Sequence, residues 1–439
     1  MSILMPILRM FIAPFFSKKY RFRYFTIFVL IGTIFGLTAC LQESEDELLE
    51  RSLVKIYDSV NQTRYFTGTD LMATQDGYIL IGRYKDVAVE EFALLYILKV
   101  DREGKFVWEK TYPAYYLARS IHPVEGGFAI FASDYKEDIP FFLKFDAEGN
   151  LIENKPLDVP ERLMLWAEKS EYDDSYLILT SNFRIIDEQT SRLIKVSSTG
   201  DVVWQREFQA DKNVFNNRFF STRNAPFFAK SLPNQQGIYF QIPHCLAFST
   251  AQADLNGEQA KPFLKGELNF SVVNAAIFYE NDYIVAGFDP EENLLHLFTR
   301  LNLRQRLQDS VQITLFDDCQ SYTGRNENLL YNYFNAADAD LRGIILPDID
   351  TTRPLVMRLW NNQILIGATT KAGQVVVLLY DPKKSVSNAF SSLYFGENYP
   401  YSLSNFRIEG EDLLIIGTTQ LVGEVPRLFF IRTPLSRFK

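Results

Sequence analysis

The chain has 439 residues, with 45 Lys or Arg against 54 Asp or Glu, and its formal net charge is −9. Proteins that bind nucleic acid neutralise phosphates with clustered basic side chains, so this acidic balance argues against a nucleic-acid partner. It argues equally against adhesion to an anionic lipid surface by charge alone. The first 39 residues contain basic but no acidic side chains, so the rest of the chain is more acidic still.

The N-terminal segment has the order of an export signal. Basic residues precede an apolar stretch from Phe25 to Gly36, which ends in the four residues Leu37, Thr38, Ala39 and Cys40. A positive flank, a short apolar core and small residues before a cleavage point are typical of signal peptides. A transmembrane helix is the alternative, but it needs about 20 predominantly apolar residues, and this run is interrupted by Gly32, Thr33 and Gly36.

The run from Leu37 to Cys40 resembles the processing motif of bacterial lipoproteins, which is a Leu, two small or short residues and a cysteine. The resemblance implies cleavage after Ala39 and a diacylglyceryl group on the thiol of Cys40. We therefore expect residues 1–39 to be a signal peptide and residues 40–51 to be a lipidated tether, which is acidic from Glu43 to Glu47. Leu41 rather than Asp follows the cysteine, which resembles lipoproteins sent to the outer membrane, whether facing the periplasm or the cell surface.

An internal repeat follows the tether. Three segments have a Lys, then a turn-opening Asp or Ser, then a Gly at equal offsets, and they start 45 and 51 residues apart: KVDREGKFVWEKTY from Lys99, KFDAEGNLIENKPL from Lys144 and KVSSTGDVVWQREF from Lys195. A fainter copy has Asp254 and Gly257. Asp and Ser side chains bond to the backbone two residues on, and Gly adopts the positive φ of a tight turn. Each segment therefore predicts a hairpin between antiparallel strands.

Seven short apolar runs form a second signature, and they indicate strands that are buried on both faces. They are Tyr78–Ile81, Phe128–Phe131, Tyr176–Leu179, Ile238–Ile242, Tyr283–Ala286, Ile364–Ile366 and Leu413–Ile416. The radially packed blades of a β-propeller bury both faces of small antiparallel sheets. We expect an all-β propeller of seven four-stranded blades over residues 52–439. An eight-bladed ring is the alternative, because the interval from Asp282 to Asn362 is longer than one repeat.

The last repeat lacks one strand. Its expected strands are 402–408, 412–418 and 427–433, after which the sequence ends. The segment Ser52–Tyr57 precedes the first repeat and has the pattern of a strand. We expect it to complete the last blade, which would close the ring and remove free sheet edges.

Two of the repeats place a Trp shortly after the turn Gly, at Trp108 and Trp204. This pattern resembles the repeats of quinoprotein-like and WD-type propellers, and the resemblance implies the fold alone. The chain lacks the adjacent cysteine pair of quinoprotein alcohol dehydrogenases. We therefore expect no cofactor and give a quinoprotein-like oxidoreductase little weight.

Acidic side chains recur in the loops expected on the face opposite the Gly turns. They predict a binding rim for a cation or a basic partner, consisting of Asp86, Glu91, Asp134, Glu137, Asp138, Asp187, Glu188, Asp289 and Glu291. We expect no metal site. The alternative is a calcium ion bound by the four carboxylates between Asp338 and Asp350, although their spacing matches no calcium motif. Cys245 and Cys319 are either a disulfide or two free thiols.

The sequence contains no GxSxG, HExxH or P-loop motif. It favours a lipid-anchored module of the cell envelope that binds or assembles an envelope protein or polymer without catalysis. The alternative is an extracellular enzyme that processes glycans or peptides with carboxylates in the propeller funnel, because such pairs are defined by their separation in space.

Overall fold

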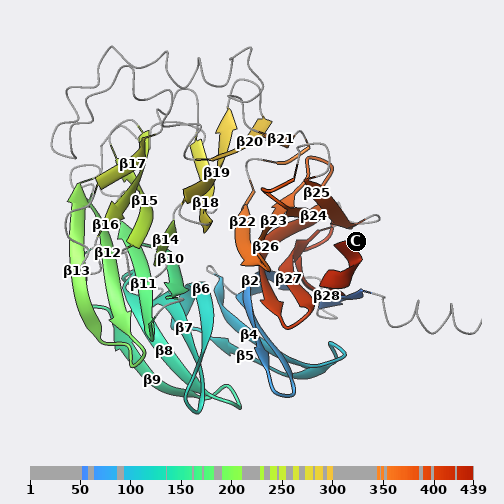
Figure 1. Cartoon of the computed structure of the whole chain (residues 1–439). Coiled ribbons are helices and arrows are strands. Elements are labelled where there is room, and N and C mark those ends of the chain that lie inside the picture. Colours follow the sequence, from blue (N-terminus) through green and yellow to red (C-terminus); the bar gives the residue numbers. More distant parts are fainter. Residues whose placement is uncertain are drawn as a thin grey trace, which may run out of the picture. The chain divides into compact units, whose positions relative to one another are not determined.

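The computed structural model is built of β-strands arranged as a β-propeller (Figure 1). It describes residues 52–57, 64–86, 93–134, 136–160, 163–170, 173–181, 190–209, 228–231, 238–244, 247–253, 261–265, 272–279, 282–289, 294–299, 344–346, 348–350, 353–384, 389–396, 400–420 and 423–438. The expected signal peptide, the expected tether from Cys40 and both remaining cysteines lie outside these residues. Among the described residues, no helix has the length and apolar character of a membrane span.

Five blades have side chains described on all four strands. The first is β2 (Arg64–Thr74), β3 (Gly77–Asp86), β4 (Leu94–Asp101) and β5 (Phe106–Tyr112). The second is β6 (Tyr115–Val124), β7 (Gly127–Asp134), β8 (Pro140–Asp146) and β9 (Leu151–Pro156). The third is β10 (Leu163–Lys169), β11 (Ser175–Ser181), β12 (Thr190–Ser197) and β13 (Val202–Gln209).

The other two blades lie in the C-terminal part of the chain. The penultimate blade is β22 (Val356–Trp360), β23 (Gln363–Thr369), β24 (Val375–Tyr380) and β25 (Phe390–Phe395). The closing blade is β26 (Tyr401–Glu409), β27 (Asp412–Thr419), β28 (Arg427–Pro434) and the N-terminal strand β1 (Leu53–Tyr57). A short 3₁₀ helix, η5 (Leu435–Phe438), follows β28.

The structure has five four-stranded blades with side chains described on every strand, where seven or eight blades were expected. Two of the seven apolar runs lie in two further sheets, whose strands also pair in sequence order but whose side chains are largely outside the described residues. One consists of β14 (Phe228–Ser231), β15 (Ile238–His244), β16 (Ala247–Ala253) and β17 (Lys261–Lys265). The other consists of β18 (Val272–Tyr279), β19 (Asp282–Asp289), β20 (Leu294–Thr299) and β21 (Ile344–Leu346).

The long interval that suggested an eighth blade contains the end of this second sheet. Its strand β21 pairs antiparallel with β20, from Leu297 opposite Ile344 to Leu295 opposite Leu346. The intervening residues lie outside the described part of the chain. Strands β20 and β21, on either side of these residues, therefore belong to one sheet.

The cores lie between neighbouring blades rather than within one sheet. Between the closing and first blades, Leu414, Ile416 and Phe430 pack against Leu80 and Leu98, each at most 1% exposed. Equivalent clusters join the first blade to the second and the second to the third. Because full burial of one such side chain is worth about 1.5–3 kcal/mol, these interfaces explain why single blades need neighbours. They also explain why the strands read as continuous apolar runs.

The predicted hairpin turns form as the repeat spacing indicates. Gly104, Gly149 and Gly200 have φ of 68°, 77° and 86°, and each donates its N–H to the carbonyl of the Asp or Ser three residues earlier. The Asp101 carboxylate also accepts the backbone N–H groups of residues 103 and 105. The repeated Lys has a separate role, because the ammonium of Lys99 reaches across its blade to the turn that joins β2 and β3.

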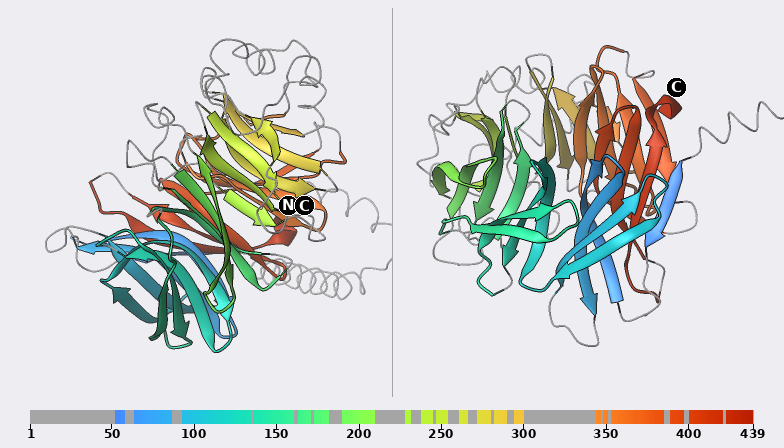
Figure 2. Two further views of the ribbon diagram at one scale, coloured as in Figure 1. Left: turned by 90° about the vertical axis from the view of Figure 1, so that its left-hand side faces the viewer. Right: turned by 90° about the horizontal axis from the view of Figure 1, so that it is seen from below.

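Strand β1 forms the outer strand of the closing blade. It pairs antiparallel with β28, from Leu53 opposite Arg432 to Tyr57 opposite Leu428, and Figure 2 shows it beside the C-terminal strands. The Tyr57 hydroxyl donates to the carbonyl of Gly104 at 2.9 Å. In the next interface, the Tyr112 hydroxyl of β5 donates in the same way to the carbonyl of Gly149. An N-terminal strand therefore makes the contact that an outer strand makes elsewhere.

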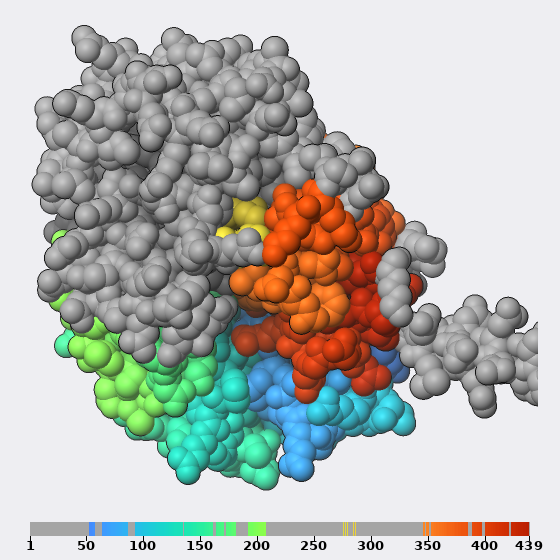
Figure 3. All heavy atoms as spheres, viewed as in Figure 1, coloured from blue at the N-terminus to red at the C-terminus, as the bar shows by residue number. Residues whose placement is uncertain are grey.

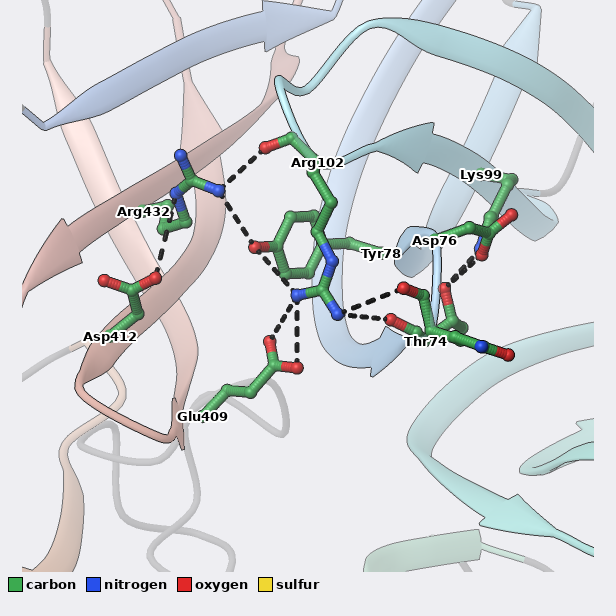
Figure 4. Close-up of polar contacts among 9 residues, drawn as sticks. Thr74, Asp76, Tyr78, Lys99, Arg102, Glu409, Asp412 and Arg432 are labelled. Carbon is green, nitrogen blue, oxygen red and sulfur yellow. Dashed lines mark hydrogen bonds and ion pairs between the residues drawn. The ribbon is translucent and has the colours of Figure 1, made fainter.

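A polar network also joins the first and closing blades (Figure 4). The Arg102 guanidinium contacts both carboxylate oxygens of Glu409 at 3.2 and 3.3 Å and donates to the carbonyl of Thr74 at 2.8 Å. Arg432 of β28 donates to the carbonyl of Arg102 at 2.9 Å. The described atoms of the two blades also adjoin at the surface in Figure 3, where they are blue and red. The junction between the ends of the propeller chain thus combines apolar packing with exposed ion pairs.

Candidate functional site

The innermost strands carry β-bulges at similar places. Register shifts occur between Gly68 and Asp70 in β2, Met164 and Trp166 in β10, and Leu403 and Asn405 in β26. Another occurs in β6, where Leu117 has a φ of 47°. A bulge turns the side chains that follow it, and polar or aromatic residues stand after these bulges.

These bulged strands and β22 lie near one another in Figure 1, and side chains from several of them bond to one another. We call it the inner-strand cluster, and it consists of Asp70, Arg119, Trp166, Glu168, Arg358, Asn405 and Arg407.

Asp70 is the most completely bonded member of the inner-strand cluster. Its carboxylate accepts the N–H groups of Leu71 at 2.8 Å and Ile121 at 3.0 Å, and the amide of Asn405 at 2.8 Å. Arg407 adds Nε at 3.1 Å and Nη2 at 2.5 Å. The Asp70 side chain is 1% exposed. The carboxylate therefore ties together strands of the closing, first and second blades, and it has no exposed oxygen to offer a substrate.

A second ion pair spans strands of nonadjacent blades. Arg358 of β22 lies 3.3 Å from a carboxylate oxygen of Glu168 in β10, with both side chains about one-fifth exposed (18% and 20%). Arg358 also donates to the side-chain oxygen of Asn405 at 3.4 Å. Asn405 in turn bonds to Asp70, so the two ion pairs belong to one connected network. The network brings strands of all five described blades into one polar centre.

Positive charge exceeds negative charge in this centre, which has the guanidinium groups of Arg119, Arg358 and Arg407 against the carboxylates of Asp70 and Glu168. Burial acts to lower the pKa of Arg407, but its charge interaction and hydrogen bonds with Asp70, together with the charge of Glu168, outweigh burial and raise it. Arginine side chains as a class stay charged throughout the physiological pH range.

The positive charge of the inner-strand cluster also affects the pKa of the neighbouring residue His122. Burial lowers the pKa of His122 well below its usual value, and the positive charges of Arg407, Lys169 and Arg358 lower it further. Its Nε2 lies 2.9 Å from the Ser120 hydroxyl, and its side chain is buried against Phe131 and Tyr176. It is a neutral core histidine.

Two donors in the cluster have no partner among the described residues. Nη1 of Arg407 makes no hydrogen bond, since Nε and Nη2 make all of the contacts of this guanidinium. The indole Nε1 of Trp166 is buried and also lacks an acceptor. Trp166 and Glu168 are two residues apart after the β10 bulge, so they share a face of the strand. An unpaired buried N–H costs roughly 1–3 kcal/mol.

The described members of the predicted acidic rim serve local structure. Asp86 is 7% exposed and pairs with Arg64 at 3.2 Å. Asp134 accepts the backbone N–H groups of residues 136, 137 and 139, and so holds its own loop. Glu137 is exposed in that loop, and Asp138 has a φ of 61°.

The remaining rim residues do not have described side chains. Asp289 ends strand β19, while Glu91, Asp187, Glu188 and Glu291 lie outside the described residues. The rim as a binding surface stays a prediction. Asp338 and Asp340 of the calcium alternative are likewise outside, and the described residues hold no group of three or more potential metal ligands.

Sequence reasoning missed the inner-strand cluster. One signal was present, because Asp70 and Arg407 are charged residues next to apolar residues within strands: Asp70 directly precedes Leu71, and Arg407 follows Phe406. A charge in such a place is buried only when it has a partner. The identity of the partner was hidden, since the two residues are 337 positions apart.

Comparison with known proteins gives no family for this chain. No family model matches it, and no curated protein matches its sequence. Among solved structures, it is similar to prolyl oligopeptidase B from Galerina marginata, with 8% identity and a TM-score of 0.42 over 82% of this chain and 47% of that one. It is also similar to a neuraminidase-like protein of A/little yellow-shouldered bat/Guatemala, with 8% identity and a TM-score of 0.36 over 87% and 98% of the two chains. The chain spans less than half the length of the peptidase, and neither likeness bears on its function.

Proposed function

We propose that this chain is a lipid-anchored binding or assembly module of a bacterial cell envelope. The motif from Leu37 to Cys40 supports the anchor, and a cysteine that carries several acyl chains attaches stably to a membrane. Leu41 after the cysteine favours the outer membrane. The partner of such a module is an envelope protein or polymer, and the acidic charge disfavours nucleic acid. The β-propeller fold suits binding or assembly, because its loops and inner strands converge from several blades.

The state of Asp70 favours binding over catalysis. A general acid or base needs a carboxyl oxygen within reach of substrate, whereas all of the Asp70 hydrogen-bonding capacity is directed to Arg407, Asn405 and two backbone N–H groups. Glu168, the other described carboxylate of the inner-strand cluster, is paired with Arg358. The alternative, an enzyme that processes glycans or peptides with funnel carboxylates, would have to use a pair outside this cluster.

The anchor is tested by fractionating cells that express Cys40→Ser, with Cys245→Ser as the matched control because it removes a different thiol. The proposal expects the Cys40→Ser chain to leave the membrane fraction in a salt wash, while the control chain remains. If Cys40→Ser protein stays in membranes, the lipid anchor is wrong.

The binding role needs a separate experiment. The anchored chain is used to recover partners from envelope extracts, and the purified chain is tested for turnover of envelope glycans and peptides. A reproducible, saturable partner without turnover supports the proposal. Turnover of a defined polymer that persists in Asp70→Asn and Glu168→Gln, without any recovered partner, supports the enzyme instead.

A further inference from the structure

The inner-strand cluster has the composition of an oxyanion site. Its described side chains carry one more positive than negative charge, while the whole chain has a formal net charge of −9. A local positive centre in an acidic protein attracts anions specifically to that place, because the rest of the surface repels them. Neutral His122 beside it adds no charge of its own.

The geometry of Arg407 makes it a prepared donor. Asp70 fixes one edge of the guanidinium through Nε at 3.1 Å and Nη2 at 2.5 Å, and Nη2 also donates to the carbonyl of Ile121 at 2.9 Å. The plane of the group is therefore set, and Nη1 still has its N–H groups to give. The side chain is 29% exposed, although its partner Asp70 is 1% exposed. A fixed, partly accessible guanidinium loses little entropy when it binds an anion.

Two neighbours extend this donor set. Arg358 is connected to Arg407 through Asn405 and Asp70, and it lies 3.3 Å from a carboxylate oxygen of Glu168. Trp166, two residues before Glu168 on β10, contributes a buried indole N–H that has no acceptor among the described residues. Such a group is stabilised when a ligand oxygen supplies the missing bond. Guanidinium groups and N–H donors are the chemistry that recognises carboxylate and phosphate oxygens.

We propose that Arg407, Arg358 and Trp166 bind an oxyanion, a carboxylate or phosphate group of the ligand, at the centre of the propeller. This assignment rests on the proposed binding role but not on the lipid anchor. Asp70 and Asn405 are positioning residues. They hold the two guanidinium groups in place and do not themselves bind the ligand. Glu168 limits the site to compact anions, since its carboxylate repels a second negative group on the Arg358 side.

In the test, the purified full chain in detergent is titrated with inorganic phosphate and, separately, with acetate. Binding is measured by calorimetry and by tryptophan fluorescence. Saturable binding of one or both is expected, and the tighter arm identifies the oxyanion class. Arg358→Gln should weaken binding by about 10- to 100-fold, as expected for loss of a charged hydrogen bond. Trp166→Phe keeps an aromatic ring but removes the indole N–H, and it should weaken binding about 3- to 10-fold and abolish the fluorescence change.

Arg64→Gln is the matched control, because Arg64 lies on the same strand as Asp70 but pairs with Asp86 away from the cluster. It should leave binding unchanged. The assignment is overturned if neither anion binds saturably, or if Arg64→Gln weakens binding as much as Arg358→Gln. Trp166→Phe keeps the test valid if Arg358→Gln fails to fold. Since the Cys40→Ser fractionation and partner recovery do not use these variants, failure of the oxyanion site is distinguishable from failure of the proposed function.

Discussion

Arg407 holds Asp70 by two hydrogen bonds from one edge of its guanidinium group, at 3.1 Å from Nε and 2.5 Å from Nη2. The pair joins the first strand of the first blade to the first strand of the closing blade. Buried pairs of this kind add little net stability compared with apolar packing, but breaking one leaves a charge without its partner. The pair is therefore a sensitive point for the integrity of the propeller.

Asp70→Asn should lower the free energy of unfolding by about 3–5 kcal/mol, because Arg407 keeps its charge and loses its counterion. Urea denaturation at neutral pH, with an unchanged m-value, measures this loss. The matched control is Asp201→Asn, which breaks an ion pair with Lys155 in which Asp201 is 68% exposed, and it should cost at most about 1 kcal/mol.

Adding Arg407→Gln to Asp70→Asn should recover part of the lost stability, since the uncompensated charge is then removed. If Asp70→Asn and Asp201→Asn lower the free energy of unfolding by equal, small amounts, solvent stabilises the unpaired charge of Arg407. The pair then behaves as a solvent-exposed one.

A glycine substitution separates turn strain from packing between blades. Gly149 has a φ of 77°, and a Cβ there would lie 2.5 Å from Cη2 of Trp108 in the preceding blade. Gly126 has a similar φ of 79°, but a Cβ there would meet nothing within 4 Å. Gly126→Ala should therefore cost about 1–2 kcal/mol of unfolding free energy, and Gly149→Ala about 1–3 kcal/mol more, because it also overpacks the interface.

Thermal or urea unfolding of the two glycine variants gives the comparison. Trp108→Ala combined with Gly149→Ala should remove the excess cost, since the clashing ring is gone. If Gly149→Ala costs no more than Gly126→Ala, Trp108 moves aside and the interblade contact is not tight.

The turns and the closing strand were predictable because local chemistry determines them. Asp101 and Gly104 make the turn that their spacing indicates, and Tyr57 occupies the place that Tyr112 has in the repeat. The central cluster was not predictable in this way. Asp70 finds Arg407 through the arrangement of whole blades, and no spacing in the sequence encodes that encounter.

His122 makes the stability depend on pH. Its pKa is well below 6.5 in the folded state, so below pH 6.5 the unfolded chain binds a proton that the folded chain does not. Stability is therefore fully present above this pH and falls on acidification toward the folded pKa, by up to about 1.4 kcal/mol per pH unit. Urea denaturation between about pH 7 and 5, above the usual titration of carboxylates, should show this slope.

His122→Gln is the control for that slope, because Gln does not titrate and retains a hydrogen-bonding group near Ser120. The difference in slope between the two chains isolates His122 from the other histidines. Parallel pH profiles would mean that His122 is protonated in the folded chain, which contradicts its placement beside Arg407 and Arg358.

The two kinds of contact that close the propeller should respond differently to salt. Arg102 and Glu409 form an ion pair with side chains 41% and 34% exposed, so a double-mutant cycle with Arg102→Gln and Glu409→Gln should give a coupling of about 0.2–1 kcal/mol that falls in 1 M salt.

Tyr57→Phe removes a neutral hydrogen bond to the Gly104 carbonyl and should cost about 0.5–1.5 kcal/mol. That cost should persist in salt, because no charge pair is screened. Tyr394→Phe on an outer strand, where the residue is 54% exposed, is the matched control and should be neutral. A Tyr57→Phe chain as stable as the control would mean that β1 closes the blade through its strand pairing alone.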